Sequence, residues 1–508
     1  MFDIFRRIAK PDIRNIVPIQ KNPVLSPGLI ILTGGKFLDV AVSVVSIRVF
    51  TTFLTKEHVG TVYLILSLIS FFSLFGISPI GLYVNRKINQ WILNKTVINH
   101  LSLYNIYIAC IALLSIPAVF IAQASTHISS TISLFSSMVI ISLCIYSTTW
   151  NSTIIPVFNL LGRRTEFVVF SFLTSAANLG FSVALSVFFS KTAYYWLLGQ
   201  IVAQSIITII ALQHFRKVLS EERASRWWKQ IARSDLKVFI LFILPLAITS
   251  LCYWAQTQSY RIIIERFVGL EYLALIGVGF GLSSRLAAIV ESLVQQYFYP
   301  AYLKRITTDK KDNRINAWSF IAENTIPVYL SIAIFISCIA PFLTKILIGD
   351  NFQDAYLFVI FGIWIEFFRM ATGVFSSVAH SEMKTSFLLV PNITGGIFGI
   401  GGTYLCVKFF HSNYSVPVLL VFCGIVTTIV TALFMKKLLP LHLNYRKLLW
   451  SIILTLPVFL VLLFKNHATV ITSGIILGVS GLYLLFIQLI LFLRSSKYTR
   501  SAVYSDIE

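Results

Sequence analysis

Long apolar stretches alternate with short polar loops along nearly the whole chain. A helix needs about 20 apolar residues to cross roughly 30 Å of hydrocarbon, and the chain supplies about fourteen stretches of that length. The predicted spans are 28–54, 59–84, 100–123, 132–156, 167–189, 193–214, 238–260, 270–297, 319–344, 355–379, 386–407, 416–435, 448–464 and 469–493. Because no loop between them exceeds roughly 25 residues, the pattern predicts an all-α, polytopic membrane protein without a catalytic domain outside the membrane.

Composition excludes a soluble protein. Of the 508 residues, 57% are hydrophobic and only 12% are charged, and the mean hydropathy is +0.82. A soluble domain usually contains about 25% charged residues. The N-terminal stretch is basic and polar and lacks the apolar core of a signal peptide, so we expect no cleavable signal.

The basic residues behind the net charge of +21 are concentrated in every second loop. If the N-terminus lies in the cytoplasm, roughly three-quarters of the Lys and Arg residues fall in predicted cytoplasmic segments, as the positive-inside rule requires. We therefore predict an even number of spans and two cytoplasmic termini. The basic residues are scattered over every second loop and form no basic face with interleaved aromatics, which argues against nucleic-acid binding.

An internal repeat divides the chain. The stretches beginning at Ser46 and Ser259 both read Ser-x-Arg, followed by an apolar run and an acidic residue. Each half then starts in the cytoplasm with an even number of spans, which predicts two parallel, pseudo-symmetric six-helix lobes around a central cavity. The predicted divisions are a cytoplasmic N-terminal segment (1–27), an N-lobe (28–215), a cytoplasmic linker (216–237), a C-lobe (238–438), two further helices (439–494) and a cytoplasmic tail (495–508).

The first span carries charges on one face. Lys36, Asp39, Ser43 and Ser46 fall within a narrow arc of the predicted helix, and Val, Ile, Phe and Leu occupy the rest. A charge at the centre of a bilayer costs about 3 kcal/mol, so this face should meet protein or water. At the matching positions of the second lobe the side chains are uncharged and include Gln256.

Charges also lie inside two spans of the C-lobe. In the tenth span, Glu366 and Arg369 repeat the i, i+3 spacing of the first span. Either they form an ion pair within one helical turn or they line a cavity, and the two interpretations are compatible. The eighth span carries Arg285, Glu291 and Gln296 on several faces, so we expect much of this helix to be hydrated.

Two further arginines, Arg48 and Arg261, lie near the predicted outer ends of their spans. Long side chains there reach the headgroup region, so we favour anchoring or a gate ion pair over substrate binding.

Signatures of catalysis and of ATP use are absent from the sequence. It contains no P-loop, no nucleophile with an adjacent base and no cluster of His, Cys and carboxylates with metal-ligand spacing. The six cysteines all lie inside apolar stretches without CxxC spacing, which is typical of small core residues. We therefore expect a protein that is not an enzyme and has no cofactor, apart from possible coupling to H⁺ or Na⁺.

The first two spans resemble those of a known transporter family. A basic N-terminus and a first helix with a lysine and an acid are followed by Arg48, Leu54, Glu57 and Gly60, and then by FGISPIGLY in the second span. These features resemble the polysaccharide-flippase branch of the multidrug/oligosaccharidyl-lipid/polysaccharide exporter superfamily, which includes bacterial O-antigen and capsule repeat-unit flippases. The resemblance covers about the first 440 residues, and the last two spans are an appendage.

The resemblance implies a flippase of the bacterial inner membrane. It would move an undecaprenyl-pyrophosphate-linked oligosaccharide from the cytoplasmic to the outer leaflet by cation-coupled alternating access. Its partners would be this lipid-linked oligosaccharide, membrane lipids and, in addition, a polysaccharide polymerase and a chain-length regulator. The implied substrate-binding residues are Lys36, Arg285, Arg369, Gln256 and Gln296, and the implied ion-coupling residues are Asp39, Glu366 and Glu291.

Three alternatives stay open. A cation-coupled multidrug exporter and a lipid II flippase belong to the same superfamily. A membrane glycan polymerase or ligase belongs to a different class, and it would need a long outer loop with catalytic Arg or His residues, whereas the outer loops here are short.

Overall fold

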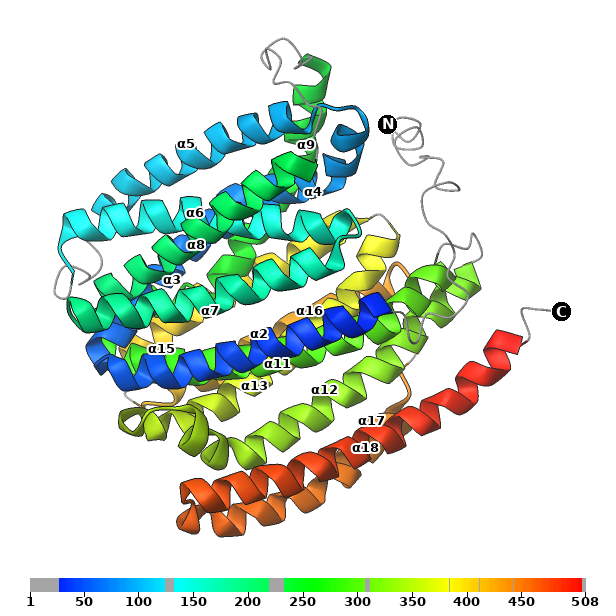
Figure 1. The fold of residues 1–508 in the computed structure, drawn as a ribbon. Coiled ribbons are helices and arrows are strands. Elements are labelled where there is room, and N and C mark those ends of the chain that lie inside the picture. The colour runs from blue at the N-terminus through cyan, green and yellow to red at the C-terminus, as the bar shows by residue number, and fades with distance from the viewer. Residues whose placement is uncertain are drawn as a thin grey trace.

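The computed structural model describes residues 27–123, 132–218, 233–306, 311–382, 384–410, 412–441 and 443–504. Over these residues the chain is a bundle of long helices without a β-strand (Figure 1). The elements are α2 (Pro27–Phe53), α3 (Lys56–Phe71), η3 (Phe72–Ile77), α4 (Ser78–Leu93), α5 (Val97–Gln123), α6 (Leu134–Leu160), α7 (Arg164–Phe188), α8 (Ala193–Val218), α9 (Arg233–Thr257), α10 (Tyr260–Phe267), α11 (Leu270–Ile306), α12 (Lys311–Leu347), η6 (Asp350–Ala355), α13 (Tyr356–Ser381), η7 (Thr385–Leu388), α14 (Leu389–Ile397), η8 (Phe398–Gly402), α15 (Thr403–Phe409), α16 (Ser415–Lys436), α17 (Tyr445–Thr455), η9 (Leu456–His467) and α18 (Val470–Tyr504).

The all-α membrane fold predicted from the sequence is confirmed. In the described part of the chain, 12 helices are long and apolar enough to cross a membrane. The helices α2 and α9, with 27 and 25 residues, occupy the predicted first and seventh positions and have the length of a span. Some helices are longer than their apolar cores predict: the second runs over Lys56–Leu93 instead of 59–84, because its polar end continues as helix outside the apolar layer.

The helix packing repeats with an offset of six spans. The first span, α2, packs on α7, and its counterpart α9 packs on α14. In the same way α5 packs on α6 and α6 on α8, while α12 packs on α13 and α13 on α16. This repetition supports two parallel lobes, which we call the N-lobe (α2 to α8) and the C-lobe (α9 to α16). The exact divisions between them stay predictions.

Two helical segments follow the C-lobe. The pair formed by α17 with η9 and by α18 packs against α12 at one edge of the bundle (Figure 1). Gln488 on α18 donates a 2.8 Å hydrogen bond to Ser331 Oγ on α12, which fixes the register of this contact inside the membrane layer. The two helices therefore form an addition to the outside of the C-lobe.

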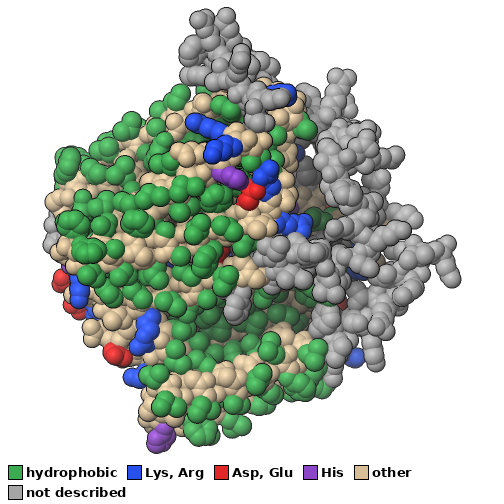
Figure 2. Space-filling model, in the orientation of Figure 1, with side chains coloured by type: hydrophobic (Ala, Val, Ile, Leu, Met, Phe, Trp, Pro, Cys, Tyr) green, Lys and Arg blue, Asp and Glu red, His purple; other side chains and the backbone are tan. Residues whose placement is uncertain are grey.

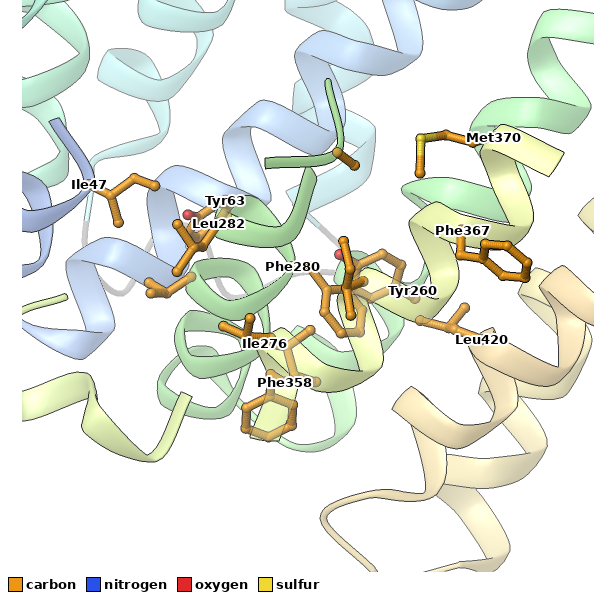
Figure 3. Close-up of a cluster of buried hydrophobic side chains, with 14 of the residues drawn as sticks. Ile47, Tyr63, Tyr260, Ile276, Phe280, Leu282, Phe358, Phe367, Met370 and Leu420 are labelled. Atoms are coloured by element: carbon orange, nitrogen blue, oxygen red, sulfur yellow. The ribbon is translucent and has the colours of Figure 1, made fainter. Parts of the chain in front are cut away.

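The two lobes touch most closely where α3 crosses α11. A Cβ atom at Gly60 would lie 2.1 Å from the carbonyl oxygen of Leu270, and one at Gly277 would lie 2.4 Å from the ring of Tyr63. Glycine at these positions lets the backbones approach, as small residues do between membrane helices. Around this crossing lies a continuous apolar core with contributions from both lobes (Figure 3).

The surface agrees with a membrane location. Hydrophobic side chains cover most of the visible described face, and charged side chains gather along its lower left edge and in its upper right part (Figure 2). The beginning of α2 and the end of α18 lie on the same side (Figure 1), which we call the terminal side; the opposite side, where η6 lies, is the η6 side. That the terminal side is cytoplasmic stays a prediction.

Parts of several predicted segments lie outside the described residues. These are most of the N-terminal segment, residues 219–232 of the linker with their two tryptophans, and the end of the tail. The helices take in the edges of the predicted linker (216–237), since α8 ends at Val218 and α9 begins at Arg233.

Candidate functional site

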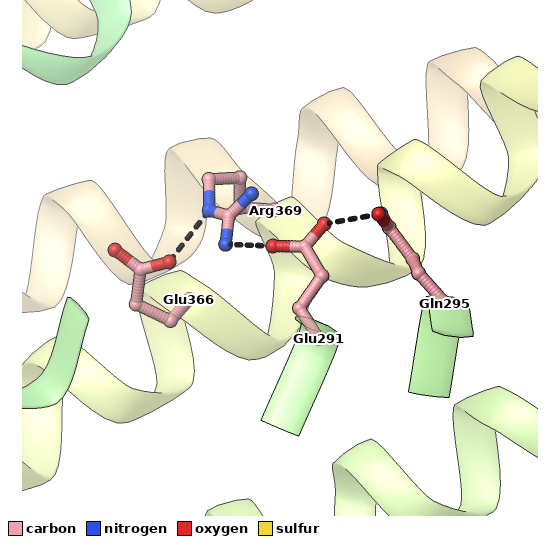
Figure 4. Close-up of polar contacts among 4 residues, drawn as sticks. All are labelled: Glu291, Gln295, Glu366 and Arg369. Carbon is pink, nitrogen blue, oxygen red and sulfur yellow. Dashed lines mark hydrogen bonds and ion pairs between the residues drawn. The ribbon is translucent and has the colours of Figure 1, made fainter. Parts of the chain in front are cut away.

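The strongest charge cluster in the described spans joins three side chains of the C-lobe. Arg369 on α13 donates from Nε to Glu366 Oε2 at 2.5 Å, and from Nη2 to Glu291 Oε2 on α11 at 2.7 Å (Figure 4). We call Glu366, Arg369 and Glu291 the charge triad. Their side chains are 14%, 30% and 25% exposed, so the triad is shielded but still reached by water.

The local sequence explains why α13 presents this cluster. Its buried positions, among them Ile363, Phe367 and Met370, recur at helical spacing and pack into the core. Glu366 and Arg369 therefore project together from another face, and the ion pair expected from their i, i+3 spacing forms. Glu291 joins from a helix 78 residues away in sequence, which no local pattern indicates.

The triad carries a net charge of −1 if both carboxylates are ionised. A planar guanidinium binds two acceptors at once and remains charged at any physiological pH. Substrate binding by Arg369 and ion coupling by Glu366 and Glu291 stay predictions.

A shallow space, open to the outside and lined among the described residues by a single helix, lies next to Glu291. Its volume is about 580 Å³, and its lining comes from one face of α11: Ala288, Glu291, Ser292, Gln295, Gln296 and Tyr299. Gln295 Nε2 lies 3.3 Å from Glu291 Oε1, and Gln296 Nε2 donates to Ser292 Oγ at 3.2 Å (Figure 4 shows the first pair). We call this space the α11 cavity. Of the predicted substrate-binding residues, Gln296 lines it directly.

Arg285 lies on α11 between the two lobes. Its Nη1 donates to the carbonyl oxygen of Ser43 on α2 at 2.7 Å. The residue is exposed and lies within the helix Leu270–Tyr299, which is long and apolar enough to cross a membrane. Among the residues described, no carboxylate lies within ion-pair distance of Arg285. Arg285 is thus a cation without an acidic partner there, in contrast to Arg369.

The charged face of the first span is only partly described. Asp39 is half-buried and accepts a 3.2 Å hydrogen bond from Ser175 Oγ on α7, within the N-lobe. Close packing of α2 on α7 makes this contact possible, because Gly35 leaves room for Val168. The side chain of Lys36 lies outside the described residues.

Gln256 lies in the packing of the C-lobe. Its Nε2 donates to Thr427 Oγ1 on α16 at 3.1 Å. Its Oε1 lies so close to Gly395 that a Cβ atom added there would be 2.5 Å from this oxygen. It does not belong to the lining of the α11 cavity, and its contact with substrate stays a prediction.

Arg48 and Arg261 both bridge the lobes on the η6 side. Arg48 Nη1 donates to three carbonyl oxygens at the end of α12, those of Lys345, Ile346 and Ile348, at 3.2, 2.6 and 3.2 Å. Arg261 lies over the ring of Tyr63 at 5.4 Å and donates to its carbonyl oxygen at 3.4 Å. The acceptors of Arg48 are carbonyl groups at the negative dipole end of a helix, and its role in anchoring or in a gate stays a prediction.

The remaining residues of the α11 cavity have only a weak signature in the sequence. Ser292, Gln295 and Tyr299 were not among the predicted binding residues. Their spacing of three and four residues along α11 places them on one face with Ala288, and this spacing was the available signal. Ser175, the partner of Asp39, belongs to a serine stripe of a kind that often only packs helices together.

Comparisons with known proteins show which solved structures share the fold of this chain. No protein-family model matches the chain, and no curated protein matches its sequence. Among solved structures, the lipid II flippase MurJ in an inward closed conformation matches with a TM-score of 0.64 and 14% identity, over 94% of this chain and 99% of that one. An inward-facing multidrug resistance MATE family transporter of the MOP superfamily matches with a TM-score of 0.55 and 13% identity, over 81% of this chain and 97% of that one. The chain therefore has the fold of these transporters.

Proposed function

We propose that the chain is a flippase for a lipid-linked oligosaccharide, of the undecaprenyl-pyrophosphate type used for O-antigen or capsule. It would carry this substrate from the cytoplasmic to the outer leaflet of the bacterial inner membrane, with both termini cytoplasmic. The observation that carries the proposal is Arg285, an exposed cation on a long apolar helix that has no carboxylate beside it among the described residues.

A cation inside a membrane span costs free energy. A charge held within a membrane span is expensive unless a partner or water compensates it, and such charges mark substrate or ion pathways. A guanidinium offers five N–H donors, and among the described residues Arg285 donates one hydrogen bond, to the carbonyl oxygen of Ser43. A pyrophosphate, with several anionic oxygens, is a suitable ligand for the remaining donors.

The charge triad is the candidate for coupling transport of the substrate to uptake of H⁺ or Na⁺. Arg369 already contacts two carboxylates, so it has less capacity to hold a phosphate than Arg285. If Glu291 takes up H⁺ or Na⁺, its hold on Arg369 weakens and the contact between α11 and α13 is loosened. Asp39 and Glu366 are further candidates for coupling, the first in the N-lobe and the second within the triad.

Alternating access requires the lobes to separate on one side at a time. On the η6 side they are joined by Arg48, by Arg261 and by the Gly349 N–H, which donates to Thr51 Oγ1 at 2.8 Å. Release of substrate on that side requires these contacts to break.

We extend the proposal to a polysaccharide polymerase and a chain-length regulator as partners that receive the translocated glycan.

A lipid II flippase is the second candidate. The match to MurJ covers 94% of this chain, so 6% of its 508 residues, about 30, are not matched. Even if all of these unmatched residues lay in 445–504, at least half of that region, which holds α17 and α18, would be matched. The likeness to the MATE transporter covers 81%, so the multidrug alternative is supported over a smaller part of the chain. Fold alone does not choose between these substrates.

The test is transport by the full-length protein in liposomes that contain a labelled undecaprenyl-pyrophosphate oligosaccharide. We expect Arg285→Ala to reduce translocation at least tenfold and to weaken binding of undecaprenyl pyrophosphate, since a charge-assisted contact is lost. Arg285→Lys should keep part of both. Arg266→Ala is the matched control, because Arg266 is exposed at the end of α10. Full transport and binding by Arg285→Ala would overturn the proposal.

A further inference from the structure

Tyr63, on α3 of the N-lobe, lies in a groove on α11 of the C-lobe. Two glycines one turn apart form this groove. A Cβ atom at Gly277 would be 2.4 Å from the Cδ2 atom of Tyr63, and one at Gly281 would be 2.9 Å from its hydroxyl oxygen. Tyr63 is only 9% exposed and belongs to the apolar core around the crossing of the two helices (Figure 3). A side chain at either glycine would therefore compete with the tyrosine for the same space.

The groove leads to Arg285. Gly277, Gly281 and Arg285 follow one another at steps of four residues, so they form one ridge along α11. The ring of Tyr63 meets the first of these residues and its hydroxyl group meets the second, so the polar end of the side chain points towards the third. Four residues advance a helix by about 6 Å. An electrostatic interaction between Tyr63 and Arg285 agrees with this placement.

A second arginine of the C-lobe holds Tyr63 from α10. The guanidinium carbon of Arg261 lies 5.4 Å from the centre of the Tyr63 ring, and its Nη1 donates to the carbonyl oxygen of Tyr63 at 3.4 Å. A cation over the face of a tyrosine ring is attracted by the electrons of that ring. A side chain of the N-lobe is thus enclosed between two elements of the C-lobe, α10 and the groove of α11.

These contacts require the lobes to be together on the η6 side. When the lobes separate there, Tyr63 has to leave the groove with α3, because Arg261 and both glycines stay with the C-lobe. Arg285 then loses two neighbours from the N-lobe, Tyr63 and the carbonyl oxygen of Ser43, to which it donates at 2.7 Å. The surroundings of the Arg285 guanidinium therefore depend on whether the η6 side is closed.

We propose that Tyr63 is a positioning residue that couples closure of the η6 side to binding of an anion by Arg285. While Tyr63 lies in the groove, it restricts the Arg285 side chain and favours the bound anion. Withdrawal of Tyr63 weakens the site and promotes release. Because coupling between two equilibria is reciprocal, an anion bound to Arg285 favours closure of the η6 side. This inference rests on the proposed function, since it takes Arg285 as the anion site, and it adds the regulation of that site.

The test combines two measurements on the full-length protein in nanodiscs. One is the affinity for undecaprenyl pyrophosphate, and the other is the distance across the η6 side between spin labels at the exposed positions Thr55 and Asn351, in a background without native cysteines. In the unaltered protein, we expect the lipid to increase the ratio of closed to open molecules at least threefold. Tyr63→Leu keeps an apolar side chain beside Gly277 but has no ring for Arg261. It should bind the lipid about fivefold more weakly, and its distance distribution should no longer respond to the lipid.

Variants of the glycines test the groove without changing Tyr63. Gly277→Ala places a methyl group where the ring lies, so it should displace the ring and remove the response to the lipid as Tyr63→Leu does. Gly373→Ala on α13 is the matched control, because a Cβ atom at this exposed glycine would meet no described atom within 4 Å. It should leave both measurements unchanged.

The outcomes separate the two proposals. If undecaprenyl pyrophosphate does not bind, or binds independently of Arg285, the proposed function fails. If the lipid binds through Arg285 but the distance distribution responds alike in the unaltered protein and in Tyr63→Leu, or responds in neither, only the coupling through Tyr63 is overturned. The same holds if Tyr63→Leu opens the η6 side without lowering the affinity for the lipid, because Tyr63 would then be a structural contact alone.

Discussion

Arg369 and Arg285 lie in the same lobe, on neighbouring helices that face the interior, yet their surroundings are opposite. Arg369 is held by two carboxylates from two helices, whereas Arg285 donates to one backbone carbonyl and is exposed. The first arrangement ties the cation into the packing of α11 on α13, and we propose that the second leaves it available to an anion. A charge inside a membrane protein therefore has to be judged by its partners, because the residue type alone does not reveal its role.

Arg48 shows a third arrangement. It lies on the η6 side and donates to three carbonyl groups at the end of α12, so its charge is compensated by a helix dipole. Its acceptors belong to the other lobe, so its hydrogen bonds join the two lobes on the η6 side, whereas those of Arg369 stay within the C-lobe.

The largest effect on stability should follow Arg369→Ala. The change leaves Glu366 and Glu291 close together without a cation, and loss of one partner from a shielded ion pair costs about 3 kcal/mol. The free energy of unfolding in mixed detergent micelles measures the loss. The variant Glu291→Gln/Glu366→Gln/Arg369→Gln removes every charge and should recover most of the stability. Equal stability of Arg369→Ala and the unaltered protein would show that the triad is not structural.

Arg48→Ala should have the next largest effect. It removes charge-assisted hydrogen bonds to the end of α12, worth about 2 kcal/mol in all, and these bonds exist only while the η6 side is closed. The equilibrium should therefore shift towards opening on that side. Spin labels at Thr55 and Asn351, in a background without native cysteines, would report a longer distance between the lobes. An unchanged distance distribution would argue against a gate at Arg48.

Glu291→Gln should change coupling more than stability. The remaining pair of Glu366 and Arg369 is neutral, so we expect a cost of about 1 kcal/mol. Stimulation of transport by a H⁺ or Na⁺ gradient should disappear, while exchange without a gradient continues. Glu323→Gln is the control, because Glu323 pairs with Lys447 at 3.3 Å between α12 and α17. Gradient stimulation that persists in Glu291→Gln would exclude this carboxylate from coupling.

The sequence predicted the helices and the pair of Glu366 with Arg369, because both follow from regular spacing along a single helix. It did not predict that Glu291 would join them, since that contact depends on how α11 and α13 rotate against each other in the packed bundle. The same limit explains Gln256. It belongs to the polar face of its helix, and the close approach of α9 to α14 at Gly395 directs it to Thr427. The acceptors of Arg48 are backbone groups at a helix end, which a pattern of side chains does not reveal.

Arg285→Ala should have the smallest effect on stability and the clearest effect on substrate. Only the bond to the Ser43 carbonyl is lost from an exposed side chain, so the free energy of unfolding should fall by about 0.5 kcal/mol. Adding undecaprenyl pyrophosphate should stabilise the unaltered protein against unfolding, because a ligand stabilises the state that it binds, and this stabilisation should be absent from Arg285→Ala. Arg369→Ala should show the reverse, a large loss of stability with the response to the lipid retained. If both variants lost the response equally, the two arginines would act as one site, and the division between a structural and an available cation would not hold.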